Sequence, residues 1–249
     1  LYVSQESMIF PGTPLPSDFQ FEFDLPFEER TVVVDGAEIN ALHFQQPDPR
    51  GLIFFLHGNG GNLESWTENA EYYQRVNYDL FIFDYRGYGK STGNIDSEEQ
   101  LHADVRAAWD TVAKRYTDKS IVIYGRSLGT ALAARLATEV DSDLLILVSP
   151  FTSVVSMARR QYPFLPDRLV RYPLRTEDII DNVEEPIVFV HGDRDRLIPI
   201  EHSFALRERV SAPSKMLIIE GAGHNDIHRF RTYLDGLTAE LNDLVALAN

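Results

Sequence analysis

The chain has 249 residues, a formal net charge of −15 and no cysteine. A length near 250 residues fits one α/β domain, and a chain of that length buries enough surface to fold without a disulfide or a structural metal. The acidic balance disfavours nucleic acid as a partner, because like charges repel. The lack of cysteine excludes disulfide frameworks, thiolate zinc sites and cysteine nucleophiles. The sequence holds no apolar run of the length that spans a bilayer.

Short apolar runs bounded by turn residues predict β-strands. Most are rich in Ile, Val and Phe, which is typical of strands buried on both faces of a parallel sheet. Helix-like segments lie between them, notably 97–115 and the Ala- and Leu-rich 130–140. The alternation predicts an α/β fold with a mostly parallel central sheet, covered by helices on both faces. The runs are Thr31–Val34, Leu52–Leu56, Leu80–Phe83, Ile121–Tyr124, Leu144–Val148, Ile187–Val190 and Met216–Ile219.

Two regions break this alternation. Residues 1–27 hold four prolines among aromatic residues and are expected to form an extended lead-in packed on the body. Residues 150–186 lie between two predicted strands and exceed an ordinary crossover loop in length. Their prolines keep any helices short. We expect a single domain over 1–249, with a small cap at 150–186 inserted after the sixth strand.

The strongest motif is Gly125-Arg126-Ser127-Leu128-Gly129. It follows the run 121–124 and precedes the helix-like 130–140, which is the strand–turn–helix context of a nucleophile elbow. Glycines flank the turn because side chains there would clash. Ser127 is therefore the candidate nucleophile. The alternative is a structural turn with an idle serine.

A glycine-rich loop, His57-Gly58-Asn59-Gly60-Gly61-Asn62, follows the run 52–56. In α/β-hydrolases such a loop supplies one backbone N–H of the oxyanion hole, and the residue after the nucleophile supplies the other. Asn59 and Leu128 are the candidates, with Gly60 the near alternative to Asn59. His57 is expected to be structural, since it precedes the nucleophile and breaks the usual order for a base.

Two later loops carry the candidate acid and base. In α/β-hydrolases the acid follows the serine and the histidine follows the acid. Asp193 and Asp195 both fit that order, and we favour Asp195, because Asp193 is better placed to hold the turn. His224 sits between glycines in Gly221-Ala222-Gly223-His224-Asn225-Asp226 and is favoured as base. His202 and His228 also fit the order, but they lie in helix-like stretches.

The segment Asp84–Ser91 follows the run 80–83 and carries a carboxylate and a hydroxyl. Asp84 could serve as an acid and Ser91 as a nucleophile. The favoured interpretation is a shaped structural loop near the elbow.

At these motifs the chain resembles the α/β-hydrolase superfamily from about Thr31 onward. The combination HGNGGN, DYRGYGKS, GRSLG, HGDRDRLIP and GAGHND is similar to a branch of membrane-anchored serine hydrolases that includes protein depalmitoylases. Members of that branch often begin with an apolar anchor, followed by a segment similar to Tyr2–Pro11. The resemblance implies an N-terminal anchor that is absent from this chain and membrane association through it, with a cytoplasmic location otherwise.

These residues predict a serine hydrolase of the carboxylesterase or thioesterase type. Ser127 attacks an acyl ester or thioester, His224 is the base, Asp195 orients His224, and an acyl-enzyme forms. No cofactor and no metal are expected. The alternatives are a serine peptidase of the same fold and a non-catalytic binding module. The oligomeric state is left open.

The predicted cap is locally basic in an acidic chain. Its arginines suggest that the cap faces an anionic membrane surface or head group. The alternative is a set of salt bridges to the acidic body. The arginines are Arg159, Arg160, Arg168, Arg171 and Arg175, with Asp167 as the one acid among them.

Overall fold

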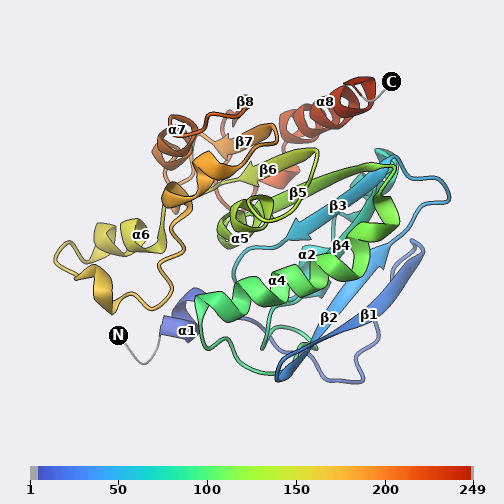
Figure 1. Cartoon of the computed structure of the whole chain (residues 1–249), viewed down its shortest axis with the longest axis horizontal. Helices are drawn as coiled ribbons and strands as arrows, with labels where there is room; N and C mark the ends of the chain where they lie inside the picture. Colours follow the sequence, from blue (N-terminus) through green and yellow to red (C-terminus); the bar gives the residue numbers. More distant parts are fainter. Residues whose placement is uncertain (1–4, 248–249) are drawn as a thin grey trace. The chain divides into compact units, whose positions relative to one another are not determined.

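The computed structural model describes residues 5–247, apart from the side chains of Gln161 and of residues 245–247. The first residues of the lead-in, and of the segment Tyr2–Pro11 within it, lie outside the described residues. The contacts separate two compact units that meet in sequence between Ile121 and Val122. Figure 1 shows the helices and strands of both units, coloured along the chain. The expected single-domain organisation stays a prediction.

The first unit contains the strands β1 to β4, in the sheet order β1-β2-β4-β3. β1 (Phe27–Val34) pairs antiparallel with β2 (Ala37–Phe44), and β2 pairs antiparallel with β4 (Asp79–Phe83). β3 (Gly51–Leu56) is parallel to β4. Every residue of β3 and β4 is buried, so both faces of these strands are covered.

Helix α4 (Glu98–Val112) is the longest helix of the first unit and confirms the predicted helix at 97–115. The Ser97 side chain accepts a hydrogen bond from Gln100 N–H at the helix start. The apolar face of this helix, which includes Leu101 and Val105, is buried. The other helices are α1 (Gln5–Ile9), α2 (Leu63–Trp66), α3 (Ala70–Arg75) and the 3-10 turn η2 (Ala113–Tyr116).

The lead-in packs on the first unit through backbone pairing. Gly12 forms a parallel bridge with Gly61, and Pro14 forms one with Gly89. Thr13 N–H donates to the Gly61 carbonyl at 2.9 Å, and Gly89 N–H donates to the Thr13 carbonyl at 3.0 Å. The extended lead-in expected from the sequence is confirmed for this stretch.

The second unit contains four strands in the order β5-β6-β7-β8. These are β5 (Ser120–Arg126), β6 (Leu144–Val148), β7 (Ile187–Gly192) and β8 (Ser214–Ile219), and each neighbouring pair is parallel. All residues of β6 and β7 are buried, as expected for strands with helices on both sides. The predicted parallel sheet is therefore present here.

Helix α5 (Leu128–Ala137) follows β5 and is buried at every residue except Arg135. It begins two residues before the predicted start, directly after Ser127. Two further helices, α7 (Glu201–Arg207) and α8 (Arg231–Leu247), contact β7 and β8 respectively. Within residues 5–247, no helix has both the length and the apolar character needed to cross a bilayer.

The region predicted as a cap lies between β6 and β7. It contains one short helix, α6 (Val154–Gln161), whose start is held by a hydrogen bond from Ser156 N–H to the Ser153 side chain. Short 3-10 turns follow, as the prolines led us to expect. They are η3 (Asp167–Leu169), η4 (Thr176–Asp178) and η5 (Ile180–Asn182), and η6 (Ile227–Arg229) lies later in the chain.

One strand, β2, was not predicted from the sequence. Its sequence, AEINALHF, mixes polar and apolar residues, so it does not form a continuous apolar run. Asn40 and His43 are nevertheless buried in it. Asn40 donates to Glu29 at 2.7 Å, and His43 lies 2.8 Å from the Tyr116 hydroxyl, so both polar side chains have partners.

Candidate active site

Ser127 occupies a strained turn between β5 and α5. Its φ of 52° and ψ of −119° lie outside the regions that L-residues favour. A Cβ on Gly125 would lie 2.6 Å from the Gly129 carbonyl oxygen and 2.7 Å from Ala133 Cβ, so only glycine fits there. Ser127 N–H donates to the Val148 carbonyl at 2.9 Å, which ties the turn to the end of β6. Such backbone strain is characteristic of functional positions.

Three side chains predicted from the sequence come together in the second unit. His224 Nε2 lies 2.9 Å from Ser127 Oγ, and His224 Nδ1 lies 2.7 Å from Asp195 Oδ2. An ionised carboxylate can only accept hydrogen bonds, so the proton of a neutral His224 sits on Nδ1. Nε2 is then free to accept the hydroxyl proton of Ser127.

The carboxylate of Asp195 is buried and held by several donors. Oδ1 accepts from the N–H groups of Leu197 and Ile198 at 3.0 and 2.8 Å, and Oδ2 lies 3.4 Å from His191 Nε2. Burial alone would raise the pKa of Asp195. The contacts with His191, His224 and Ile198 N–H outweigh burial and hold this pKa well below its usual value. Asp195 is therefore an anion at neutral pH.

His191 forms a second imidazole contact with the same carboxylate. Its Nε2 lies 2.8 Å from the Ile198 carbonyl, and its Nδ1 lies 2.6 Å from Ser203 Oγ. A carbonyl only accepts, so Nε2 carries a proton, and in a neutral His191 Nδ1 accepts from the Ser203 hydroxyl. A second series of contacts therefore runs from a serine through a histidine to an aspartate, namely Ser203, His191 and Asp195. Ser203, however, is fully buried. Sequence reasoning assigned no role to His191 or Ser203; the four-residue spacing between His191 and Asp195 was the available signal.

The loop that carries His224 is fastened by two aspartates. Gly221 N–H donates to Asp193 Oδ1 at 2.6 Å, and Gly223 N–H donates to Asp226 Oδ1 at 2.7 Å. Asp193 thus holds the turn, as expected, and Asp195 reaches the histidine.

Arg126 adds a third fastening to this loop. Its Nη2 donates to the His224 carbonyl at 3.3 Å and lies 3.2 Å from His228 Nδ1. His228 therefore faces a guanidinium. The remaining alternative base, His202, lies with Nδ1 3.1 Å from Thr152 Oγ1. Of the three histidines that fit the expected order, His224 is the one hydrogen-bonded to Ser127.

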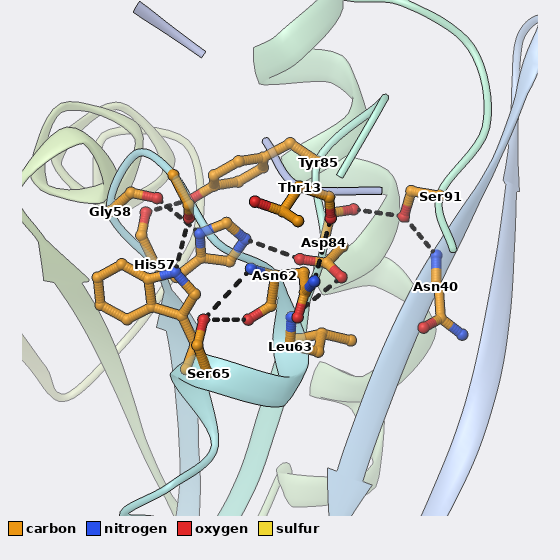
Figure 2. A network of polar contacts seen from close by, with 12 residues as sticks. Thr13, Asn40, His57, Gly58, Asn62, Leu63, Ser65, Asp84, Tyr85 and Ser91 are labelled. Carbon is orange, nitrogen blue, oxygen red and sulfur yellow. Dashed lines mark hydrogen bonds and ion pairs between the residues drawn. The ribbon is translucent and has the colours of Figure 1, made fainter. Parts of the chain in front are cut away.

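The first unit holds a separate polar network around His57 (Figure 2). His57 is fully buried, with Nδ1 2.7 Å from the Gly58 carbonyl and Nε2 3.4 Å from Asp84 Oδ1. The Tyr85 hydroxyl donates to the His57 carbonyl at 2.7 Å. These contacts fit the structural role expected for His57. Asn59 and Gly60 lie in the same loop, and their assignment to an oxyanion hole stays a prediction.

Asp84 and Ser91 are also buried in this network (Figure 2). Asp84 Oδ2 accepts from Leu63 N–H at 3.1 Å. The Ser91 hydroxyl donates to the Asp84 carbonyl at 2.7 Å and accepts from Asn40 N–H at 2.8 Å. Both side chains therefore hold loop backbone in place, as the structural interpretation expects.

Known proteins give an independent view of the chain. Residues 47–172 match the Hydrolase_4 family, described as serine aminopeptidase, S33. Alpha/beta hydrolase domain-containing protein 17B of Xenopus tropicalis is 35% identical over 200 residues, covering 77% of this chain and 66% of that protein. The human protein 17B is 34% identical over 200 residues with the same coverage. The chain thus spans about two thirds of the length of these curated relatives.

Solved structures show the same fold. The Pyrococcus furiosus esterase Pf2001 superimposes with a TM-score of 0.72 at 16% identity, covering 95% of this chain and 98% of the esterase. This agreement confirms the α/β-hydrolase fold. The matched family and the protein 17 relatives confirm the resemblance to the depalmitoylase-like branch drawn from the motifs. The chain belongs to the Hydrolase_4 family of the α/β-hydrolase superfamily.

Proposed function

We propose that this protein is a serine hydrolase that cleaves ester or thioester bonds of acyl substrates through an acyl-enzyme. One observation carries the proposal: Ser127 Oγ, His224 and Asp195 form a continuous hydrogen-bonded series with distances of 2.9 and 2.7 Å. These are the contacts that activate a serine for attack on a carbonyl.

The proposed steps use the chain's own groups. His224 Nε2 takes the Ser127 proton as Oγ bonds to the acyl carbon, and Asp195 stabilises the imidazolium. His224 then gives that proton to the leaving alcohol or thiol. A water, deprotonated by His224, then attacks the acyl carbon; the acyl–Oγ bond breaks, His224 returns the proton to Ser127 Oγ, and the acid is released. The N–H groups of Leu128 and Asn59 are proposed to hold the oxyanion, each worth about 3 kcal/mol in comparable sites.

Labelling with a fluorophosphonate tests the nucleophile. Wild type should be labelled and Ser127→Ala should not. Ser203→Ala is a matched control, because Ser203 also contacts a histidine that reaches Asp195 but is buried. It should leave labelling intact. An unlabelled wild type, or labelling that persists in Ser127→Ala, contradicts the proposal.

A substrate series then defines the bond that is cleaved. We expect turnover of acyl esters and thioesters, with an optimum in chain length that reports the acyl pocket. Thioesters are included in the series because the motifs of this chain resemble those of depalmitoylases.

A serine peptidase is the second candidate, because the matched family is described as serine aminopeptidase. Aminoacyl p-nitroanilides, assayed beside p-nitrophenyl esters, separate the two. Hydrolysis of the anilides at a kcat/KM equal to that of the esters would favour the peptidase. Labelling of Ser127 without turnover of either series would favour a binding role.

A further inference from the structure

The segment 159–172 exposes large apolar side chains. Phe164 is 97% exposed, Tyr162 44% and Leu169 41%. Single exposed apolar residues are ordinary on soluble proteins, but these three fall within eight positions of one loop. In Figure 1 this yellow segment extends beyond α6, away from β6 and β7. Exposed apolar surface of this kind marks an interaction site.

The same segment is positively charged. Arg159, Arg160, Arg168 and Arg171 are all exposed, while the chain as a whole carries −15. Segment 159–172 holds four arginines and one acid, so 4 − 1 gives a local charge of +3, and Arg175 raises this to +4 over residues 159–175.

The one acid of this stretch is shared by two of its arginines. Asp167 pairs with both Arg159 and Arg175, and Arg175 also reaches Glu177 at 3.8 Å. One carboxylate shared by two arginines cannot neutralise the segment. These pairs join residues that all lie within the predicted cap, 150–186. They are therefore not the salt bridges to the acidic body that the sequence offered as an alternative.

The tip of this segment, residues 162–170, needs few hydrogen-bond partners from outside for its backbone. Pro163 and Pro166 have no N–H, which removes two donors. Leu165 N–H donates to the Tyr162 carbonyl at 3.0 Å, and Val170 N–H donates to the Asp167 carbonyl at 2.9 Å. A backbone that meets its own hydrogen bonds can enter a region poor in water at low cost.

We propose that segment 159–172 is a docking surface for bilayers that contain anionic lipids. Phe164 and Leu169 enter the boundary between head groups and acyl chains, and the arginines contact the head groups. An anionic membrane surface attracts exposed apolar side chains that are flanked by arginines, as they are in this segment. The proposal goes beyond the proposed chemistry and does not require turnover.

Vesicle binding tests the surface directly. Phe164→Trp places a fluorophore at the tip, and the spectrum of wild type, which contains Trp66 and Trp109, is subtracted. Cosedimentation and emission are measured with phosphatidylcholine vesicles, with or without phosphatidylserine. Each is measured at about 0.05 M NaCl and at about 0.5 M NaCl, where screening is strong. Phe204→Trp on α7, where Phe204 is 40% exposed, is the matched control.

We expect binding only to phosphatidylserine vesicles, reversed at high salt. The added emission of Phe164→Trp should shift to the blue on binding, and that of Phe204→Trp should not. The double variant Arg168→Gln/Arg171→Gln should bind roughly 25-fold more weakly, about fivefold for each arginine. Arg106→Gln/Arg231→Gln makes the same change of net charge elsewhere and should bind as wild type.

Three results would overturn the proposal. The first is no binding to phosphatidylserine vesicles at low salt. The second is binding of Phe164→Trp without a shift of its added emission, which would place the contact elsewhere or point to a partner other than a bilayer. The third is an equal loss of binding in the two double variants, which would show a bulk charge effect. None of these readouts depends on Ser127, so they can be repeated in Ser127→Ala.

Discussion

Arg126 donates a hydrogen bond to the carbonyl of His224, a residue 98 positions further along the chain, at 3.3 Å. Because Arg126 directly precedes Ser127, one side chain links the turn of the proposed nucleophile to the loop of the proposed base. Arg126→Met should therefore lower kcat roughly tenfold with little change in KM, since a small misplacement of a reacting group is costly.

The control for this variant is Arg135→Met on α5, where Arg135 is partly exposed and pairs with Glu139. It should keep the wild-type kcat. A change in KM alone for Arg126→Met would mean that Arg126 contacts substrate and does not position His224.

His191 is expected to act through Asp195. The folded-state pKa of Asp195 is depressed, so this carboxylate stabilises the fold above its unfolded pKa, and that stability is lost as the pH falls through the folded pKa. His191→Leu should raise the Asp195 pKa and cost about 1.5–3 kcal/mol at neutral pH, the usual range for a hydrogen bond to a charged group.

Urea unfolding at pH 7 and at pH values below about 4 checks this prediction. The deficit of His191→Leu should shrink progressively as the pH falls from the unfolded pKa of Asp195, about 4, toward its lower folded pKa, because a protonated Asp195 no longer gains from His191. Ser203→Ala leaves the Asp195 contact in place, so any deficit it shows should not vary with pH. A deficit of His191→Leu that is constant with pH would indicate packing alone.

Gly125 is expected to tolerate no side chain. A Cβ there would meet backbone and side-chain atoms of Gly129, Thr130 and Ala133 at 2.6–2.7 Å. Gly125→Ala should cost at least about 2 kcal/mol of stability and abolish labelling of Ser127. Gly223→Ala is a control, since its nearest contact would be 3.4 Å from Asp226. A Gly125→Ala protein with the wild-type Tm would contradict the clash.

His43 should make the first unit sensitive to mild acid. Burial, and to a smaller degree the charges of Arg115 and Arg30, lowers the pKa of His43 to about 4. The unfolded chain binds this proton near pH 6.5, so stability falls as the pH drops from 6.5 toward 4, by up to about 3 kcal/mol. Asp79, whose pKa is raised by burial, offsets part of the loss near the lower end.

Denaturation between pH 7 and about pH 4.5 tests this dependence. His43→Gln should flatten the curve, because it removes the titrating group and keeps an amide donor for the Tyr116 hydroxyl. His102→Gln on α4, where His102 pairs with Glu98 at 3.5 Å, should keep the wild-type slope. Parallel curves for wild type and His43→Gln would refute the assignment.

The sequence predicted the strands that are apolar along their whole length, because burial on both faces leaves a continuous signal. It missed β2, whose buried Asn40 and His43 form hydrogen bonds with side chains of other elements. No local pattern shows that such partners exist.

The same limit applies to the site. Ser127, Asp195 and His224 could be selected by their order and by the loops that follow strands. Arg126 could not be selected, and His191 offered only its four-residue spacing to Asp195, because their roles arise from contacts made after folding. The Arg126 contact joins residues 98 positions apart, and the His191 contact depends on how β7 ends beside Asp195.

The lead-in determines where a shortened version of this protein should begin. Without residues 10–16, the carbonyls of Gly61 and Gly89 would lose their N–H donors from Thr13 and Leu15, and the Tyr88 ring would lose its contact with Gly12. A shortened protein that starts at β1 would therefore lack a backbone hydrogen bond that holds the loop carrying Asn59. A shortened protein for crystallisation should start upstream of Phe10, even though the first strand begins at Phe27.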